Sequence, residues 1–362
     1  MNKVIIILPS LGGGGAEKNA VAVANYLSRN YLVEIVCCYK NEETKSREDL
    51  DKRVSVRFLE KNKVIHALYD IYKLIRKEKP KAVITTVAYF SLLFSVIIPF
   101  LPSSVNYICR ETNIPEIYGA QKGLAYRFLS NIIYRYCYRN YNIVVCQSDD
   151  MLSSIQCVTK LPQTSLVKIN NPALISNNRY DNSFKLPDDI PFNSQEYFIA
   201  AGRLTYQKGF DLLIDDFYKS TLRQRGFKLL IAGTGPDEKS LKLRVRDLDL
   251  ENDIHFLGFR NDVESLIANA RGFILSSRFE GFPNVVLEAL TLGCPVLGKD
   301  CPGGLRELIK VDINGALYDE NFIDVAESFL NTEFNKEIII SDVKNRFDLN
   351  TLFYKYHELI ER

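Results

Sequence analysis

The sequence has few of the residues that build metal centres and disulfide frameworks. It contains three histidines, and no His/Asp cluster has the spacing of a metal site. None of its eight cysteines forms a C-x-x-C pair, and several lie within apolar, strand-like runs. Because no secretory signal precedes the first strand, we expect reduced, buried thiols in a cytoplasmic protein, with no metal and no cofactor.

Long hydrophobic runs are missing as well. The longest apolar stretch, residues 89–101, has 13 residues and includes Pro99. A helix needs about 20 residues to span a bilayer. We therefore expect a buried helix here, and we expect any contact with a membrane to be peripheral, on the inner face of the cytoplasmic membrane.

Composition and charge indicate a large folded protein with two unlike halves. With 362 residues, 46% of them hydrophobic and 25% charged, the chain can build a sizeable core and most simply forms two domains. Residues 1–170 contain 23 Lys+Arg against 14 Asp+Glu, and the remainder contains 23 against 30, so the net charge of +2 divides into +9 and −7. The basic half suits an anionic partner or membrane surface. It carries no nucleic-acid-binding motif, so nucleic acid is not an expected partner.

Strand-like and helical segments alternate along the first half. Continuous apolar runs such as KVIIIL at residues 3–8 are typical of strands that are buried on both faces of a parallel sheet. The expected strands are 3–8, 32–38, 54–58, 82–86, 105–109 and 142–147, with helices at 16–29 and 69–79. This βαβα order predicts a doubly wound parallel sheet.

A polar segment then separates two similar halves. After Asn171, Pro172 and the polar residues 176–194, the alternation restarts. The expected strands are 197–201, 228–232, 254–257, 272–275 and 295–298, with helices at 210–221, 238–247, 262–269 and 351–362. The sequence therefore predicts an α/β fold of two Rossmann-like domains facing a central cleft. The expected boundaries are 1–172 for the first domain, 173–194 for a linker, 195–345 for the second domain and 346–362 for a closing C-terminal helix.

The first candidate site is the run of four glycines at residues 12–15. Glycine lets the backbone approach a ligand closely, and the N–H groups at the start of the following helix point to the same place, so a phosphate or a sugar can bind here. The pattern is not G-x-G-x-x-G, since Glu17 stands three positions after Gly14, which disfavours a dinucleotide dehydrogenase. A plain strand-to-helix turn explains the glycines equally well.

The second candidate site follows the strand at 197–201. Arg203 and Lys208 lie five residues apart on a strand-to-helix loop and can converge on a diphosphate. Gly233, Gly235 and Pro236 form another tight turn after the next strand. The alternatives are two solvated cations and an ordinary turn.

The third candidate site lies in the segment SSRFEGFPNVVLEALTLGCPVLGKDCPGG, residues 276–304. Glu280 and Glu288 stand eight positions apart, and Pro283 between them is expected to mark a helix start. The free N–H groups near Asn284 and Val285 then form a positive helix end that can receive an anion. A structural alternative has Glu280 capping the helix and Glu288 pairing with a cation such as Arg278.

Together these motifs resemble glycosyltransferase family 4, a family of retaining enzymes with the GT-B fold whose signature is Glu-x7-Glu in the C-terminal domain. The resemblance covers nearly the whole chain, and the segment 300–304 with Arg306 and Glu307 is similar to members that build bacterial surface glycans, such as lipopolysaccharide and capsule. It is carried by Gly14-Gly15-Ala16-Glu17, Asn171-Pro172, Gly202-Arg203, Lys208-Gly209, Gly233-x-Gly235-Pro236, Phe256-Leu257-Gly258, Glu280 to Glu288 and Gly293-Cys294-Pro295-Val296.

The resemblance implies a role for each matching position. Glu280 would contact the hydroxyls of the donor sugar, and Glu288 would hold the ribose hydroxyls of the nucleotide. Arg203 and Lys208 would neutralise the donor diphosphate, which removes the need for a metal ion. The other substrate-binding positions are Gly14 and Gly15, which would approach the diphosphate from the first domain, Gly233, the backbone around Phe259 and Arg260 beside the base, and Gly281, Phe282, Pro283, Asn284 and Val285 between the two glutamates.

One feature departs from the family pattern. Many members place a histidine near the end of a strand in the first domain, against the donor sugar. Here the corresponding place after residue 109 holds Arg110 and Glu111. Either residue can substitute for the histidine, or the acceptor itself can supply the interaction, so the group that assists removal of the acceptor proton stays open.

The segment 121–141 joins basic and aromatic residues in a helical pattern. It carries Lys122, Arg127, Arg135 and Arg139 among tyrosines and phenylalanines. Such a helix can lie on an anionic membrane or bind a lipid diphosphate. The alternative is a core helix with arginine stems along its edge.

The expected function is that of a metal-independent, retaining, hexosyltransferase-type glycosyltransferase. Its partners would be a nucleotide-sugar donor, UDP-linked, and a glycan or polyprenyl-linked glycan acceptor of surface polysaccharide synthesis. A nucleotide-sugar epimerase of the same architecture and a non-catalytic nucleotide-binding or glycan-binding protein are the alternatives.

Overall fold

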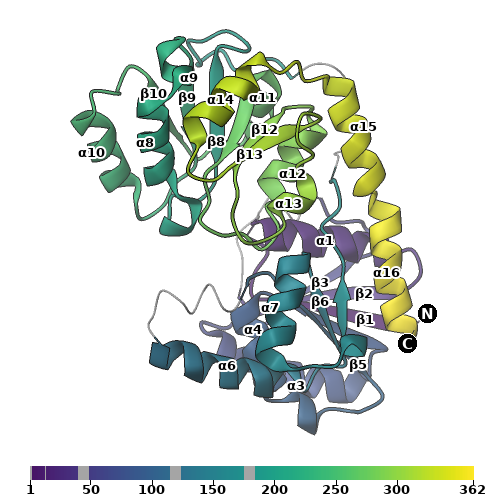
Figure 1. The fold of residues 1–362 in the computed structure, drawn as a ribbon. Coiled ribbons are helices and arrows are strands. Elements are labelled where there is room, and N and C mark those ends of the chain that lie inside the picture. The colour runs from purple at the N-terminus through teal and green to yellow at the C-terminus, as the bar shows by residue number, and fades with distance from the viewer. Residues whose placement is uncertain (1, 13, 40–48, 115–123, 175–183) are drawn as a thin grey trace. The chain divides into compact units, whose positions relative to one another are not determined.

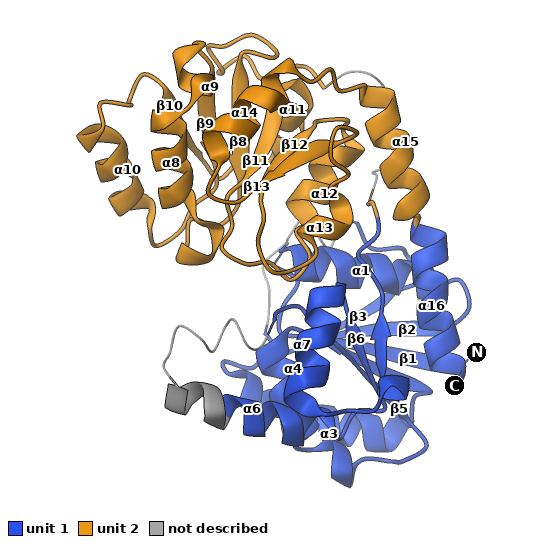
Figure 2. Cartoon of the chain, in the orientation of Figure 1, with its two compact units in different colours: residues 1–172, 349–362 blue, residues 173–348 orange. Residues whose placement is uncertain are grey.

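The computed structural model describes residues 2–12, 14–39, 49–114, 124–174 and 184–362, without the side chains of residues 124–129 (Figure 1). The chain divides into two compact units (Figure 2). Unit 1 consists of residues 1–172 and 349–362, and unit 2 consists of residues 173–348. The expected linker therefore falls within unit 2, and the C-terminal helix returns to unit 1.

Unit 1 contains a seven-stranded parallel sheet. Its strands lie in the order β3-β2-β1-β4-β5-β6-β7, so the chain reverses its direction of winding between β1 and β4. The strands are β1 (Lys3–Leu8), β2 (Leu32–Cys37), β3 (Ser55–Phe58), β4 (Ala82–Thr86), β5 (Asn106–Arg110), β6 (Ile143–Cys146) and β7 (Leu166–Lys168). The central strand β1 is buried from Val4 to Leu8, which explains its unbroken apolar sequence.

Helices cover the unit 1 sheet. Residues from α3, α4, α6 and α7 share one hydrophobic core with the sheet, in which Phe90, Phe94 and Tyr138 are fully buried. The C-terminal helix α16 packs beside α1, where the rings of Tyr26 and Phe353 meet at 5.7 Å. The helices are α1 (Gly15–Leu27), α3 (Val64–Glu78), α4 (Ala88–Ser95), the 3-10 turn η1 (Ile98–Phe100), α6 (Leu124–Tyr138), α7 (Asp149–Thr159), the 3-10 turn η2 (Gln163–Ser165) and α16 (Leu349–Glu361).

Unit 2 contains a six-stranded parallel sheet in the order β10-β9-β8-β11-β12-β13. The strands are β8 (Tyr197–Ala201), β9 (Lys228–Ala232), β10 (Ile254–Gly258), β11 (Gly272–Leu275), β12 (Val296–Lys299) and β13 (Gly315–Tyr318). The helices are the 3-10 turn η3 (Tyr206–Lys208), α8 (Phe210–Lys219), α9 (Thr221–Gln224), α10 (Glu238–Asp247), α11 (Val263–Asn269), α12 (Asn284–Thr291), α13 (Leu305–Leu308), α14 (Phe322–Asn331) and α15 (Lys336–Arg346). Phe198, Phe217 and Phe329 lie at the centre of its core.

The two doubly wound parallel sheets confirm the predicted α/β class, and every strand expected from the sequence is present. The two short edge strands β7 and β13 were not predicted, because a run of three or four residues is too short to show a strand pattern in the sequence. The helix expected at 69–79 begins earlier, at Val64. The expected buried helix at 89–101 is instead α4 followed by η1, and it leaves Val96 and Phe100 exposed.

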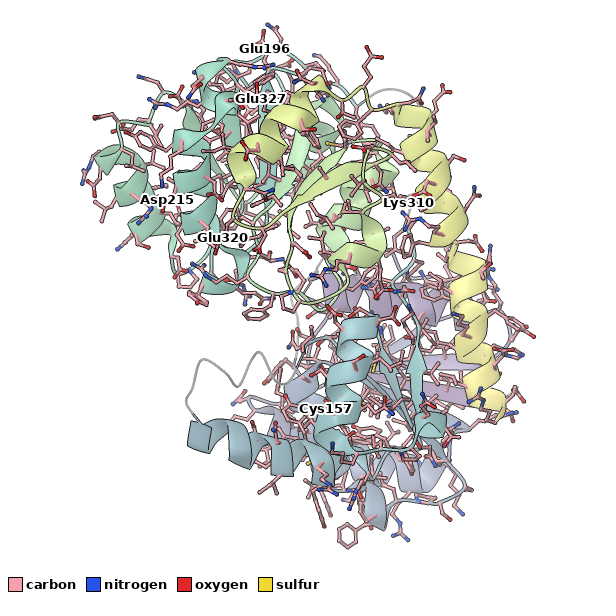
Figure 3. The ribbon with its side chains drawn as sticks, in the orientation of Figure 1. Cys157, Glu196, Asp215, Lys310, Glu320 and Glu327 are labelled. Carbon is pink, nitrogen blue, oxygen red and sulfur yellow. The ribbon has the colours of Figure 1, made fainter. Side chains whose placement is uncertain are left out.

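The cysteines are all free thiols, and seven of the eight are buried. Burial raises the pKa of Cys37 and of Cys38 to about 12, so both thiols stay protonated at neutral pH. Cys157 is the exception to the expected burial, because it lies on the exposed side of α7 (Figure 3). None of the helices in the described ranges has the length and apolar character that a membrane crossing requires.

Candidate active site

The candidate site in unit 2 is centred on Glu280, just beyond the carboxyl end of β11. The residue is 5% exposed, and Oε1 of its side chain accepts hydrogen bonds from the ammonium of Lys208 at 2.6 Å and from the hydroxyl of Ser277 at 2.5 Å. Its backbone N–H donates to the carbonyl of Pro302 at 2.9 Å. The carboxylate is therefore held by a lysine 72 residues away in the sequence and by a serine three residues before it. Ser277 was missed in the sequence, where its position directly behind a strand was the available signal.

The two-glycine turn after β12 fixes the backbone around Glu280. Gly303 has a φ of +131°, and a Cβ atom here would overlap the carbonyl of Glu280. The N–H of Gly304 donates to the carbonyl of Gly281 at 3.0 Å, and a side chain on Gly304 would overlap the ring of Phe282. Only glycines allow residues 302–304 to lie this close to the loop that carries Glu280.

Helix α12 begins directly behind this loop. Pro283 is its N-cap residue, and Asn284 and Val285 are its first two residues. The helix therefore begins one position later than it would if Pro283 were the first residue of its first turn. The helix has eight residues, and its dipole makes its start a favourable place for an anion. Glu288 is the fifth residue of α12 and is half-buried. The two glutamates thus lie on either side of this helix start.

The loop from Gly202 to Gly209 brings Lys208 to Glu280. Lys208 ends η3, and its carbonyl accepts a hydrogen bond from the hydroxyl of Ser276 at 2.9 Å. Gly233, at the end of β9, is so close to Gly202 that a Cβ atom would overlap the Gly202 carbonyl. Arg203 is exposed beside this crossing of backbones. Two cations therefore occupy one edge of the sheet, one paired with Glu280 and one open to solvent.

Arg278 binds a different partner from Glu288, the residue with which the structural alternative paired it. Its guanidinium forms two hydrogen bonds with the carboxylate of Asp211, at 2.8 and 2.6 Å, and lies 4.0 Å from the ring centre of Tyr206. The pair holds the pKa of Asp211 below its usual range. The Glu280 carboxylate, which the same alternative assigned to capping α12, is bound by Lys208 and Ser277 through Oε1.

The segment after β10 presents an aromatic ring at the same sheet edge. Phe259 is 75% exposed and follows Gly258, whose φ is +66°. Arg260 is fixed by Asp189 and Asp262, the latter at 2.7 Å. The guanidinium of Arg260 is therefore occupied, and its backbone and the ring of Phe259 are the groups that this segment offers to a ligand.

In unit 1, the glycine loop lies between the end of β1 and the start of α1. Gly14 is the N-cap residue of α1, Gly15 is its first residue, and both are exposed. The carboxylate of Glu17 folds back over Gly14, where its Oε2 would lie 2.5 Å from an added Cβ atom. The loop is at the switch point of the sheet, between the neighbouring strands β1 and β4, where α/β domains commonly bind ligands.

Arg110 and Glu111 lie at the end of β5, but they are buried, at 3% and 0% exposure. Glu111 Oε1 accepts the N–H groups of Thr112 and Asn113 at 2.7 and 3.0 Å, and Oε2 accepts the hydroxyl of Tyr138. Burial outweighs these hydrogen bonds and raises the pKa of Glu111 to about 7. Neither side chain is presented to solvent in the way that the resemblance to the family led us to expect.

The raised pKa of Glu111 predicts a pH dependence of stability. The unfolded chain releases this proton near 4.5 and the folded chain near 7, so between these values the folded state binds more protons. The free energy of unfolding should therefore fall as pH rises from about 4.5 to 7 and then level off. Urea unfolding of wild type and Glu111→Gln across this range checks the prediction, because the variant should lose this component. An equal slope in both proteins would contradict it.

Gly209 gives a test of the backbone crowding at Lys208. Gly209 and Gly258 share a left-handed φ of +64° and +66°, but a Cβ on Gly209 would overlap the carbonyl of Ser276, whereas nothing lies within 4 Å of one on Gly258. Gly258→Ala should cost about 1 kcal/mol, the strain of the backbone alone. Gly209→Ala should cost about 2–4 kcal/mol, since the β11 loop must move. Similar melting temperatures for the two variants would rule out the close approach.

Comparison with known proteins gives three results. Residues 183–340 match the family described as glycosyl transferases group 1. The chain is 26% identical to the GalNAc-alpha-(1->4)-GalNAc-alpha-(1->3)-diNAcBac-PP-undecaprenol alpha-1,4-N-acetyl-D-galactosaminyltransferase of Campylobacter jejuni, over 99% of this chain and 98% of that protein. It is 25% identical to the amylovoran biosynthesis glycosyltransferase AmsD of Erwinia amylovora, over 90% and 89%.

The fold is that of solved glycosyltransferase structures. The structure of Anabaena HepE in complex with UDP-glucose matches with a TM-score of 0.77 over 100% of both chains, at 17% identity. The lipopolysaccharide outer core galactosyltransferase WaaB matches with a TM-score of 0.71 over 99% of both chains, at 19% identity. Residues 183–340 are therefore similar to the glycosyl transferases group 1 family, and the chain has the fold of the GT-B glycosyltransferases that it matches.

Proposed function

We propose that this protein is a retaining glycosyltransferase of family 4 that moves a sugar from a UDP-linked donor to a glycan or a polyprenyl-linked glycan during surface polysaccharide synthesis. The observation that carries the proposal is the cluster of Lys208, Ser277 and Glu280 in front of the N-terminus of α12. It places a cation, a buried carboxylate and a helix start at one edge of the unit 2 sheet. A nucleotide diphosphate sugar has the matching charges and hydroxyls.

The residues divide the work of binding the donor. Lys208, Arg203 and the N–H groups of α12 bind the diphosphate, Glu280 accepts hydrogen bonds from the sugar hydroxyls, and Glu288 accepts those of the ribose. In unit 1, Gly14 and Gly15 let the backbone at the start of α1 approach a ligand closely. Lys208 is bound to Glu280 in this structure, so a donor has to compete for both groups.

Transfer breaks the bond between the anomeric carbon and the phosphate oxygen, and the electron pair leaves with UDP. The acceptor oxygen bonds to the same face of the sugar, and its proton is released. The charge that develops on UDP is stabilised by Lys208, Arg203 and the α12 dipole, groups of a kind worth about 10²–10³-fold in rate for a single donor. We propose on this basis that transfer needs no metal ion.

The names of related proteins support the choice of substrates. HepE of Anabaena binds UDP-glucose, and the Campylobacter jejuni relative acts on an undecaprenol-linked glycan. The test is UDP release by the purified protein from a panel of UDP-hexoses and UDP-N-acetylhexosamines, with and without an undecaprenyl diphosphate glycan and with EDTA present. Acceptor-dependent release, with an anomeric configuration in the product equal to that of the donor, is the expected result.

The same experiment separates the alternatives. Conversion of the donor sugar without an acceptor would identify an epimerase. Binding of a donor without release of UDP under any condition would identify a non-catalytic binding protein. Loss of UDP release in EDTA that is restored by a divalent cation would contradict the proposed metal independence.

We also propose that unit 1 meets an anionic membrane through α6. Between Lys79 and Ser148 the sequence contains two acidic residues, Glu111, which is buried, and Glu116, which lies outside the described residues. Described side chains of α6 that face outward are the apolar Ile132, Ile133 and Tyr136, with the exposed Arg135 next to them. The start of the basic segment, with Lys122 and Arg127, lies outside the described side chains.

Flotation with liposomes tests this surface. Wild type should float with vesicles that contain anionic phosphatidylglycerol and not with pure phosphatidylcholine, because aromatic and basic residues together bind anionic interfaces. Arg135→Ser combined with Tyr136→Ser should lower the recovered fraction, while Arg53→Ser, an exposed control on unit 1, should not. If the fraction of wild type that floats does not depend on the lipid charge, α6 is an ordinary surface helix and the proposal is wrong.

A further inference from the structure

Arg110 is a buried cation at the carboxyl end of β5 whose described hydrogen-bond acceptors are neutral. It is 3% exposed. Its Nη2 donates to Oδ1 of Asn171 at 2.5 Å, its Nη1 lies 3.5 Å from Oγ1 of Thr86, and its side chain also interacts with that of Tyr356. Burying a guanidinium is costly unless its N–H groups are bonded. Here these contacts reach three separate segments of the chain.

The three segments include both connections between the units. The chain leaves unit 1 after Pro172, directly beyond Asn171. It returns at Leu349, and Tyr356 lies on the returning helix α16 with 1% exposure. The third contact, Thr86, is the last residue of β4, which pairs with β5. One side chain therefore contacts the outgoing segment, the returning segment and the sheet.

A second group of hydrogen bonds strengthens the outgoing contact. Nδ2 of Asn171 donates to Oε1 of Gln147 at 2.9 Å, and Nδ2 of Asn170 donates to the carbonyl of Gln147 at 2.9 Å. Nε2 of Gln147 donates to the backbone carbonyl of Glu111 at 2.5 Å. Asn171 and Gln147 are 2% and 3% exposed, so these bonds are shielded from water. The outgoing segment is thus fastened to the ends of β5 and β6.

We propose that Arg110 is a positioning residue that fastens both inter-unit connections to the carboxyl edge of the unit 1 sheet. Any movement of one unit relative to the other requires a change of backbone conformation at these two connections. Arg110 fixes the points where such movement begins, beyond Asn171 on the outgoing side and before Tyr356 on the returning side. It also links these points to the sheet edge where ligands of α/β domains bind. The kinetic part of this inference rests on the proposed glycosyl transfer.

Hydrogen–deuterium exchange of the full chain measures the anchoring without any substrate. Arg110→Met should raise deuterium uptake in α16, residues 349–361, by about tenfold in rate, since its amides then open more easily. Uptake in the unit 2 strands should stay the same. Tyr356→Phe removes the returning contact alone, so it should raise deuterium uptake in α16 without affecting residues 169–172. Asn171→Ala removes the outgoing contact, so it should raise uptake in residues 169–172 without affecting α16. Arg53→Met, an exposed arginine paired with Asp51, is the matched control.

Kinetics of the same variants separate positioning from substrate binding. Arg110→Met should lower kcat about tenfold or more with a donor KM that changes little, and Arg110→Lys, which keeps the charge but not the fork of N–H groups, should recover part of it. Unchanged uptake in α16 in a folded Arg110→Met protein would overturn the proposal. A rise in donor KM with unchanged kcat and unchanged exchange would make Arg110 a ligand-binding residue instead. If Arg110→Met does not fold, the Tyr356→Phe and Asn171→Ala exchange patterns decide the outcome. The exchange result holds even if the protein proves not to transfer sugars.

Discussion

Lys208→Met is expected to lower kcat by about 10²–10³-fold, the largest kinetic effect of any single change in the chain. Lys208 is the cation that lies against the buried Glu280, and we propose that it neutralises the leaving diphosphate. Methionine keeps the length of the side chain and removes the charge. The measurement is steady-state UDP release at saturating donor. Lys242→Met on α10, an exposed lysine paired with Glu238, is the control and should be unaffected.

Stability of the same variant separates structural damage from loss of catalysis. The side chains of Lys208 and Glu280 are 20% and 7% exposed, so removal of the lysine leaves a mostly buried carboxylate without its partner. Breaking such a pair costs about 3 kcal/mol or somewhat less. The double variant Lys208→Met, Glu280→Gln should recover much of this loss, because glutamine can still accept the Ser277 hydroxyl.

The double variant should stay inactive even though it is stable. Recovery of the melting temperature without recovery of kcat would assign the two residues to the chemistry rather than to folding. Near-normal transfer by Lys208→Met would overturn the site assignment. Recovery of both properties in the double variant would show that the pair serves only to hold the β8 and β11 loops together.

Glu288→Ala is expected to lower kcat/KM for the donor by about 10²-fold or more through the loss of a charged hydrogen bond acceptor for the ribose hydroxyls. Glu288 is half-buried on the first turns of α12, on a rigid helix whose neighbours Leu287 and Ala289 are packed in the core. The change should leave the melting temperature nearly unchanged, since the side chain is partly in contact with solvent.

The nucleotide itself supplies the control for Glu288. Wild type should bind UDP more tightly than 2′-deoxy-UDP, because a site built for a hydroxyl leaves a charged group unpaired when that hydroxyl is missing. Glu288→Ala should bind both nucleotides with similar affinity in calorimetry. An undiminished preference for UDP in the variant would place the ribose contact elsewhere.

Much of the fold could be predicted from the sequence because its signals are local. Apolar, β-branched runs such as residues 3–8 mark buried parallel strands, and glycine, proline and polar residues mark their ends. The short strands β7 and β13 carry too few residues for a pattern. The C-terminal helix was expected from its spacing, but its place in unit 1 depends on contacts with α1, such as that of Phe353 with Tyr26, which lies more than 300 residues away in sequence.

The candidate site was predictable in part for the same reason. Arg203, Lys208 and Glu280 all follow strands, and carboxyl ends of parallel strands meet at one edge of a sheet, so their approach could be expected. The sequence did not show which partner each charged side chain binds. Arg278 binds Asp211 rather than a glutamate of α12, and Glu280 binds Lys208 and Ser277. These choices depend on the close backbone approach that Gly209 and Gly303 allow.

The sequence by itself determined the two α/β halves, the strand-end loops and the chemical groups that those loops carry, since each follows from patterns within a few residues. The tertiary structure alone decided which of these groups are exposed and which are buried. Arg110 ends β5 and Glu111 follows it, much as Arg203 comes after β8, yet the first two are enclosed by Asn171, Tyr138 and Tyr356 while Arg203 faces solvent. Burial depends on which distant segments cover a strand end, and no local pattern encodes that.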